Sequence, residues 1–264
     1  MEINKIYNEN CLETMSKMDD NFIDLVLTSP PYDNLRDYDG YNFDFKNIAK
    51  ELYRIVKDGG VVVWIVGDQV IDGDETGTSF KQALYFKEIG FKLHDTMIYQ
   101  KNNFSNPSNQ RYHQIFEYMF ILTKGKIKTV NLIKDRKNKY SQSWGKSSSR
   151  QKNGILKEKE SKKYNDFGAR TNIWKYIVGY GFNTKDAFVY EHPAIFPEKL
   201  AIDHILSWSN KNDIVYDPFM GSGTTAKGCI LSRRNFIGSE ISSKYCEIAN
   251  KRVNAYMNQQ VLEF

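Results

Sequence analysis

Apolar runs of strand length alternate with helical patterns along most of this chain, and no other feature constrains its fold as much. Residues 61–66 (VVVWIV) are β-branched and nearly all apolar, as expected of a strand buried on both faces of a parallel sheet. Strand patterns also cover residues 4–8, 22–28, 91–99, 115–122, 214–216 and 235–238. Helical patterns cover residues 11–18, 45–56, 79–89, 200–208, 224–231 and 245–257. The chain is therefore predicted to form an α/β, doubly wound, mostly parallel sheet.

This alternation stops between about residues 124 and 186. Residues 124–175 hold sixteen Lys and Arg against four Asp and Glu; the rest of the chain therefore sums to −7, within a total of +5. A basic block on an acidic body suggests contact with a polyanion, and a solvated Lys-rich loop explains the charge about equally well. We predict a core formed by residues 1–125 and 185–264, and a basic insert over residues 126–184.

Composition excludes several classes of protein. Hydrophobic residues make up 41% and charged residues 26%, as in ordinary globular proteins. No apolar run approaches ~18 residues, and the polar N-terminus does not resemble a signal peptide, so we expect a cytoplasmic protein without a membrane span. The three cysteines, Cys11, Cys229 and Cys246, form no CxxC pair, which argues against a zinc site or a disulfide framework.

A glycine-rich turn follows the predicted strand at residues 214–216. Gly221 and Gly223 lie where this strand would give way to a helix, and glycine there lets the backbone approach a ligand closely. Glu240 follows the next predicted strand, where an acidic side chain can hold ribose hydroxyls. The spacing predicts an adenosine-containing cofactor, with a plain tight turn as the alternative, and it excludes a P-loop.

A proline pair ends the predicted strand at residues 22–28. Pro30 and Pro31 have no N–H and favour an extended backbone, so nearby carbonyls and the Ser29 hydroxyl can accept hydrogen bonds from an amino group. Tyr32 offers a flat face on which a base could stack. A structural end to the strand is the alternative interpretation.

Together, these two motifs resemble those of the amino-methyltransferases that act on exocyclic nitrogens of DNA bases. Residues 28–32 (TSPPY) resemble their catalytic (D/N/S)PP(Y/F/W) motif, and residues 217–223 (DPFMGSG) resemble their FxGxG cofactor motif. Residues 8–15 (NENCLETM) are similar to an element near the cofactor adenine, with Asn10 where the family usually has Asp. Residues 192–200 (HPAIFPEKL) are similar to the segment that precedes FxGxG.

The order of these motifs resembles that of the β class, in which the catalytic motif comes first and the target-recognition region lies in the middle. The resemblance implies a Rossmann-like fold of the S-adenosylmethionine-dependent methyltransferases, with residues 126–184 as the target-recognition insert. It implies S-adenosylmethionine as cofactor and double-stranded DNA as substrate.

Three sets of residues follow from the motifs and the resemblance. The expected catalytic residues are Ser29, Pro30, Pro31 and Tyr32. The expected cofactor-binding residues are Asn10, Cys11, Thr28, His192, Phe196, Lys199, Asp217, Pro218, Phe219, Gly221, Ser222, Gly223, Thr224 and Glu240. The expected DNA-binding residues are Arg36, Tyr38, Lys134, Arg136, Lys137 and Lys139.

The expected reaction is methyl transfer to N4 of a flipped cytosine, because the SPPY form of the motif is typical of N4-cytosine enzymes in this family. Adenine N6 is the alternative, since DPPY and SPPY follow the target base imperfectly. An RNA methyltransferase, a protein-glutamine methyltransferase and a DNA-binding protein without catalysis are further alternatives. A partner restriction endonuclease and the choice between monomer and homodimer stay open.

Overall fold

A computed structural model describes residues 1–31, 43–104, 107, 109–138, 147–159, 165–192 and 195–261 of the chain. Two compact units divide it. The large unit contains Met1–Asn131 and Asn172–Phe264, and the small unit contains Leu132–Thr171. Tyr32, Arg36, Tyr38 and Lys139 lie outside the described residues, so their predicted roles rest on sequence.

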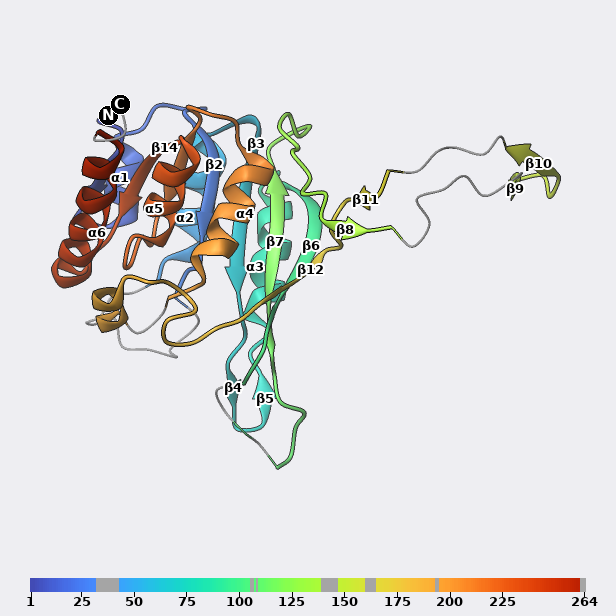
Figure 1. Cartoon of the computed structure of the whole chain (residues 1–264). Coiled ribbons are helices and arrows are strands. Elements are labelled where there is room, and N and C mark those ends of the chain that lie inside the picture. The colour runs from blue at the N-terminus through green and yellow to red at the C-terminus, as the bar shows by residue number, and fades with distance from the viewer. Residues whose placement is uncertain are drawn as a thin grey trace. The chain divides into compact units, whose positions relative to one another are not determined.

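The large unit is built on an eight-stranded sheet with the order β1-β14-β13-β2-β3-β7-β6-β12 (Figure 1). β7 is antiparallel to both of its neighbours, and every other neighbouring pair is parallel. The strands are β1 (Lys5–Tyr7), β2 (Ile23–Thr28), β3 (Val56–Val66), β6 (Lys92–Lys101), β7 (Phe116–Thr123), β12 (Ile173–Tyr176), β13 (Ile214–Asp217) and β14 (Asn235–Ser239). The predicted doubly wound α/β sheet is confirmed.

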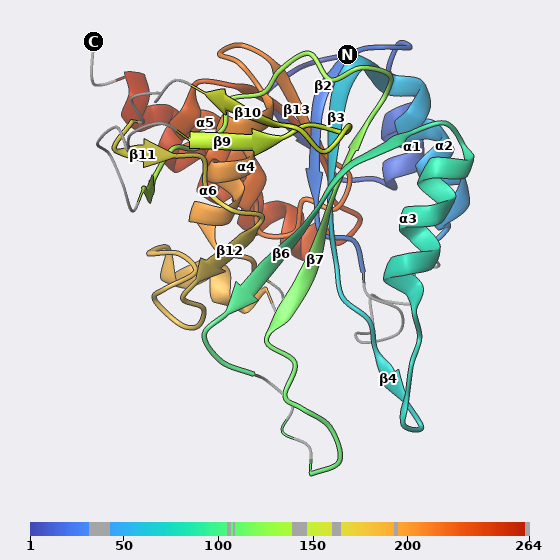
Figure 2. The same ribbon diagram turned by 90° about the vertical axis from the view of Figure 1, so that its right-hand side faces the viewer.

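Helices cover both faces of this sheet (Figure 2). One face carries α1 (Cys11–Ser16), α2 (Phe45–Ile55) and α3 (Thr78–Glu88); the other carries α4 (Glu198–Trp208), α5 (Thr224–Ser232) and α6 (Ser243–Val261). Residues 61–66 of β3 are fully buried or nearly so, as their apolar run predicts. Alternate residues of β3 face opposite layers: Val62, Trp64 and Val66 pack with α2 and α3.

Three short elements complete the large unit. A small hairpin, β4 (Val70–Ile71) with β5 (Asp74–Glu75), follows β3, and a 3₁₀ turn, η1 (Ala187–Glu191), precedes α4. No helix among the described residues is long and apolar enough to cross a bilayer.

The sheet order creates a switch point between β2 and β13. The chain continues from β2 to β3 on one side and from β13 to β14 on the other, so the two connections diverge. Ligands of open α/β sheets bind in the crevice outside the carboxyl ends of the strands at such a point. The proline pair follows β2 and the glycine turn follows β13, so both motifs open onto this crevice.

The small unit consists of two antiparallel pairs, β8 (Arg136–Lys137) with β11 (Phe167–Gly168) and β9 (Ser147–Arg150) with β10 (Leu156–Lys159). Arg170 pairs with Asp135, and the Asn138 amide donates to the Asn165 carbonyl at 2.7 Å. None of its described hydrophobic side chains is buried. The unit therefore depends on local hydrogen bonds and ion pairs.

The structure shortens the predicted insert at both ends. Ile173–Tyr176, inside the predicted range 126–184, is strand β12 and pairs with β6. The Asn131 N–H donates to the Ser207 carbonyl at 2.8 Å, which ties the first predicted residues of the insert to α4. The separate unit is thus limited to Leu132–Thr171.

Candidate active site

A cavity of about 410 Å³ opens at the carboxyl ends of the strands. It brings together residues from the proline pair, the glycine turn and the two flanking segments recognised in the sequence. The predicted site residues that line it are Asn10, Cys11, Ser29, Pro30, Pro31, His192, Phe196, Pro218, Phe219, Gly221, Ser222, Thr224 and Glu240. The cavity is thus the place where all four sequence elements meet.

Asp217 joins the end of β2 to the glycine turn from beneath the cavity. Its carboxylate accepts hydrogen bonds from the hydroxyls of Thr28 at 2.7 Å and Thr225 at 2.6 Å, and from the Phe219 N–H at 3.0 Å. Only 1% of Asp217 is exposed, and burial raises its pKa to about 6. Thr28 and Asp217 therefore act as supports for the turn and do not line the cavity.

The glycine turn adopts a backbone that side chains would obstruct. Gly221 and Gly223 have φ of 53° and 80°, in the left-handed region. A Cβ on Gly221 would lie 3.0 Å from His192 Nε2, and one on Gly223 would lie 3.2 Å from the Cα of Ala249. The turn therefore packs closely on its neighbours. Gly223 does not line the cavity; it is the N-cap residue of α5.

Glu240 extends from the end of β14 into the cavity wall. Its two carboxylate oxygens accept hydrogen bonds from the Gly221 N–H at 2.8 Å and the Ser242 N–H at 2.9 Å. Glu240 is 9% exposed, and burial raises its pKa although these N–H groups oppose the change. A carboxylate accepts up to about four hydrogen bonds, so lone pairs are left for ribose hydroxyls. The glycine cradle and this carboxylate fit an adenosine-containing cofactor.

Asn10 plays a local structural part. Its side-chain oxygen accepts the Leu12 N–H at 2.9 Å and caps α1, while the neighbouring Asn8 amide donates to the Glu240 carbonyl at 2.8 Å. Asn10 and Cys11 therefore line the cavity next to the end of β14. This position agrees with the cofactor side that the sequence predicts for them.

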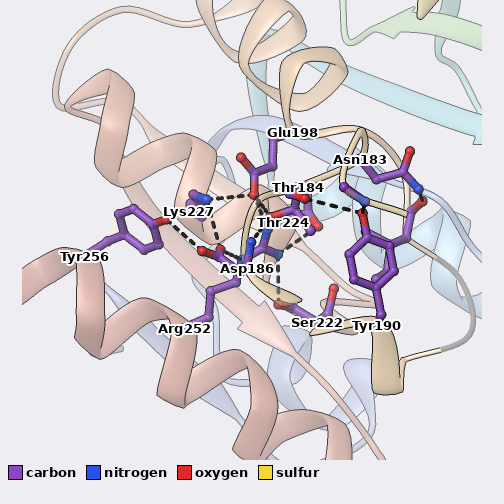
Figure 3. Close-up of polar contacts among 12 residues, drawn as sticks. Asn183, Thr184, Asp186, Tyr190, Glu198, Ser222, Thr224, Lys227, Arg252 and Tyr256 are labelled. Carbon is purple, nitrogen blue, oxygen red and sulfur yellow. Dashed lines mark hydrogen bonds and ion pairs between the residues drawn. The ribbon is translucent and has the colours of Figure 1, made fainter. Parts of the chain in front are cut away.

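The described part of residues 183–198 forms another wall of the cavity, through Asn183, Tyr190, His192, Ile195 and Phe196. A cluster of charged side chains holds this wall from behind (Figure 3). Arg252 of α6 is fully buried; its guanidinium donates to Asp186 at 2.8 Å, to Thr184 at 3.0 Å and to Glu198. The same guanidinium donates to the Ser222 carbonyl and the Thr224 hydroxyl, both at 3.1 Å. One side chain thus holds both the wall and the glycine turn.

Lys227 of α5 completes this cluster. Its ammonium lies 2.9 Å from Asp186 and 2.6 Å from Glu198, and Tyr256 donates to Asp186 at 2.8 Å. Hydrogen bonds from these donors lower the pKa of Asp186 against the effect of burial. The cluster pairs two carboxyl groups, Asp186 and Glu198, with two basic side chains, Lys227 and Arg252, so its formal charges balance.

Lys199 does not reach the cavity, and this part of the cofactor prediction is corrected. Its ammonium pairs with Asp203 at 3.1 Å and its side chain is 70% exposed. Lys199 lies in the first turn of α4 and is not among the residues that line the cavity. His192, in contrast, is 8% exposed and packs against Tyr245, with the centres of the two rings 4.3 Å apart.

Several cavity residues carry no motif and were missed from the sequence. They come from the ends of β6 and β7 and from the wall: Tyr99, Lys101, Asn103, Glu117, Asn183 and Tyr190. Strand alternation, with residues 99, 101 and 103 on one face, is the only sequence signal for the first three. Of the predicted DNA-binding residues, Lys134, Arg136 and Lys137 are exposed on the small unit. Among the described residues, no three His, Cys, Asp or Glu are placed to hold a metal ion.

Comparisons with known proteins show the family to which the chain is similar. The DNA methylase family (N6_N4_Mtase) matches residues 23–251. The orphan methyltransferase M.BamHII of Bacillus amyloliquefaciens is 56% identical over 89% of this chain and 90% of its own. The type II methyltransferase M.SmaI of Serratia marcescens is 26% identical over 94% and 90% of the two chains.

Solved structures show the same fold. M1.HpyAVI in complex with S-adenosylmethionine (SAM) superposes with a TM-score of 0.63 at 26% identity, over 94% of this chain and 98% of that one. The cytosine-N4-specific PvuII DNA methyltransferase superposes with a TM-score of 0.69 at 18% identity, over 97% and 91%. With the family match and the M.BamHII relative, these comparisons establish that the chain belongs to the DNA methylase family, in the β class of the N6/N4 amino-methyltransferases.

Proposed function

We propose that this protein methylates the N4 amino group of cytosine in duplex DNA after flipping the base out of the helix. Its cofactor is S-adenosylmethionine, and its activity as a DNA amino-methyltransferase follows from its family. The target base and the steps below are the parts that we infer.

One observation supports the choice of chemistry best: the cavity wall at the end of β2 offers hydrogen-bond acceptors, and two of its three residues have no backbone N–H. Ser29, Pro30 and Pro31 line the cavity, and neither proline has an N–H. An exocyclic amino group entering there finds the Pro30 carbonyl and the Ser29 hydroxyl. Both can accept its N–H bonds.

These acceptors favour reaction at nitrogen. The amino nitrogen is a poor nucleophile because its lone pair is delocalised into the ring, and it gains positive charge as it attacks. Acceptors already aimed at its N–H groups stabilise that charge without reorganising. When bound, S-adenosylmethionine supplies an electrophilic methyl group. Holding the nitrogen in line for attack provides much of the remaining acceleration.

The serine of the SPPY motif supports cytosine as the target, because in this family SPPY is typical of N4-cytosine enzymes and DPPY of N6-adenine enzymes. Tyr32, which follows the prolines, is proposed to stack on the flipped base. Flipping costs a few kcal/mol, and stacking offsets part of that cost. Adenine N6 is the second candidate, since the same acceptors suit either amino group.

We assign target recognition to the small unit. Within Leu132–Thr171, twelve Lys and Arg stand against four Asp and Glu, a net charge of +8. Positive charge of this density attracts the phosphate backbone, and the exposed polar side chains of β8–β11 can contact base edges.

The test is to express the protein in a bacterial host without DNA methylation and to digest its genomic DNA to nucleosides. Mass spectrometry should find N4-methylcytosine; N6-methyladenine alone would replace cytosine with the second candidate. Transfer of tritium from labelled S-adenosylmethionine to RNA or protein, and not to plasmid DNA, would overturn DNA as the substrate. A Ser29→Ala, Pro30→Ala variant is the matched inactive control.

A further inference from the structure

The cavity has a second end that neither the cofactor turn nor the proline pair accounts for. In the sheet order, the cofactor elements lie on β1, β14 and β13, and the proline pair on β2. Tyr99, Lys101 and Glu117 line the same cavity from β6 and β7, on the other side of β2. A base whose amino group meets the proline pair must therefore extend its ring toward β6 and β7, because the cofactor side is taken.

An ion pair stands at this second end. Lys101 and Glu117 are bonded to each other, and their side chains are only 26% and 15% exposed. The pairing of β6 with β7 sets their positions, since Tyr99 lies opposite Glu117 and the Lys101 N–H donates to the Ile115 carbonyl at 2.7 Å. Both side chains thus come from rigid strand ends.

This pair is a costly arrangement for a wall that only has to fill space. Taking two charges partly out of water is unfavourable, and apolar side chains of similar size often serve stability as well. The Lys101 ammonium also lies 5.6 Å from the centre of the Tyr99 ring, whose hydroxyl pKa is raised by burial and by the nearby Glu117 charge. The cavity end therefore presents a cation, a carboxylate and a neutral phenol.

We propose that Lys101, oriented by Glu117, determines which base is accepted by donating hydrogen bonds to the ring edge of the flipped base. The assignment rests on the proposed function. An ammonium has three donors and no acceptor, so it suits a ring edge that has only acceptors beside the amino group. Cytosine has two, N3 and O2.

Other bases match this subsite less well. Thymine and uracil carry an N3–H, which would point a donor at the Lys101 donors and leave both unpaired. Adenine offers N1 but has a C2–H where cytosine has its O2 carbonyl, so one donor would lose its partner. A site built to hydrogen-bond one group strongly rejects an analogue that lacks it.

The experiment compares Lys101→Met with the wild type in single-turnover methyl transfer. The duplex carries the sequence found methylated in the expression host, with cytosine or adenine at the target position. We expect the rate on cytosine to fall about 10- to 100-fold, as for loss of one or two charge-assisted hydrogen bonds. The ratio of the cytosine rate to the adenine rate should fall with it, while S-adenosylmethionine affinity stays at the wild-type value.

A second duplex separates base reading from base flipping. In it the target cytosine faces a mismatched base, so flipping costs less. The Lys101→Met defect should persist there, because the flipped base still lacks its donor. Lys92→Met, at the exposed start of the same strand, is the matched control and should behave as wild type.

Two milder variants keep the test decisive if Lys101→Met folds poorly. Lys101→Arg should retain most of the rate, and Glu117→Gln should lower both the rate and the cytosine-to-adenine ratio. A wild-type rate and ratio in Lys101→Met and Glu117→Gln, or a defect rescued by the mismatch, would overturn the inference. A wild type that methylates only adenine would instead defeat the proposed function.

Discussion

Two buried carboxyl groups, Asp217 and Glu240, accept hydrogen bonds from the glycine turn, and they differ in what surrounds them. Asp217 is enclosed by two threonine hydroxyls and one backbone N–H, with no cation among the partners described above. Glu240 receives two backbone N–H groups and borders the cavity. We therefore expect Asp217 to affect the stability of the fold and Glu240 to affect the binding of the cofactor.

The raised pKa of Asp217 predicts a pH dependence of stability. Its pKa rises from 3.8 to about 6 on folding, so the folded state holds the proton more tightly than the unfolded state. Stability is then lost as the pH rises from about 4 to about 6, by roughly 3 kcal/mol. Asp217→Asn removes this contribution. Urea unfolding at pH 4, 5, 6 and 7 should show a flatter profile for Asp217→Asn; parallel profiles would contradict the prediction.

Removing the Glu240 carboxylate should weaken cofactor binding. Glu240→Ala leaves the Gly221 N–H without its acceptor and deletes the proposed contact to the ribose. We expect Kd for S-adenosylmethionine to rise about 10- to 100-fold by calorimetry. Glu240→Gln, which keeps one acceptor, should lie between, and Glu247→Ala on the exposed side of α6 should match wild type. Unchanged affinity in Glu240→Ala would assign the residue a structural role only.

At the scale of elements, Arg252 gives α6 most of its polar contacts with the cavity wall, beside the hydrogen bond from Tyr256 to Asp186. Arg252 contacts residues 184, 186 and 198 of the wall and residues 222 and 224 of the turn. Where the structure describes it, the wall has little regular structure beyond η1, so its position depends on these contacts. His192 and Phe196 lie between the contact points in the sequence, and Tyr245 of α6 also packs on His192, so the helix helps to set where both residues face the cavity.

Arg252→Met should therefore be strongly destabilising. It leaves Asp186 and Glu198, whose side chains are 13% and 19% exposed, with Lys227 as their remaining cation in this cluster. Breaking a fully buried pair costs about 3–5 kcal/mol, and we expect a loss toward the lower end of that range. A double-mutant cycle with Asp186→Asn, followed by urea unfolding, should give a coupling above about 0.5 kcal/mol. Lys244→Met, on the exposed first turn of α6, is the control. Additive effects in the cycle would mean that the two side chains act independently.

The elements that sequence could predict are those with a clear period. The apolar run of β3 and the helical spacing of α2 reflect burial that the local sequence encodes, although β3 begins at Val56, before the predicted apolar run at residues 61–66. β12 was missed because four residues (IWKY) show no such pattern. Trp174 and Tyr176 are buried by contacts distant in sequence, including the hydrogen bond from Tyr176 to Asp203.

In the candidate site too, some residues could be predicted from the sequence and others could not. Motif residues such as Gly221 and Glu240 were predictable because their spacing reflects a turn and a strand end. Lys101 and Glu117 were not, because they meet only through the pairing of β6 with β7. Lys199 was predicted from its place in a motif. Its ion pair with Asp203, one helical turn further along α4, could not be predicted from that motif.

For the whole molecule, charge is divided between the two units. The small unit carries +8 and the remainder of the chain −3, so the positive charge is concentrated in 40 residues. With no buried hydrophobic side chain among its described residues, its strand pairs are marginally stable in isolation. We expect contact with DNA to stabilise them.

Neutralising this unit should weaken DNA binding in a salt-dependent way. In a Lys134→Ala, Lys137→Ala, Lys139→Ala variant, each lost phosphate contact should flatten the slope of log K against log salt by ~0.9. Arg136 is kept because its guanidinium donates to the Ala169 carbonyl at 2.9 Å. Duplex titration over a salt series measures the slope. The control replaces three exposed lysines of the large unit, Lys50, Lys87 and Lys211; equal slopes in both variants would mean that the cluster only faces solvent.

The way the chain closes its sheet has a consequence for how such enzymes can vary. β1, from the beginning of the chain, pairs with β14, and α6, from its end, packs on β1. A linker joining Lys5 to Val261, with a new opening in the small unit, would preserve every neighbouring strand pair of the large sheet. The glycine turn would then precede the proline pair in the sequence, while both still opened onto the same crevice. Circular permutation is thus compatible with an unchanged active site. The order of the motifs in the sequence depends on where the chain is opened, whereas the order of the strands in the sheet sets which residues meet in the crevice.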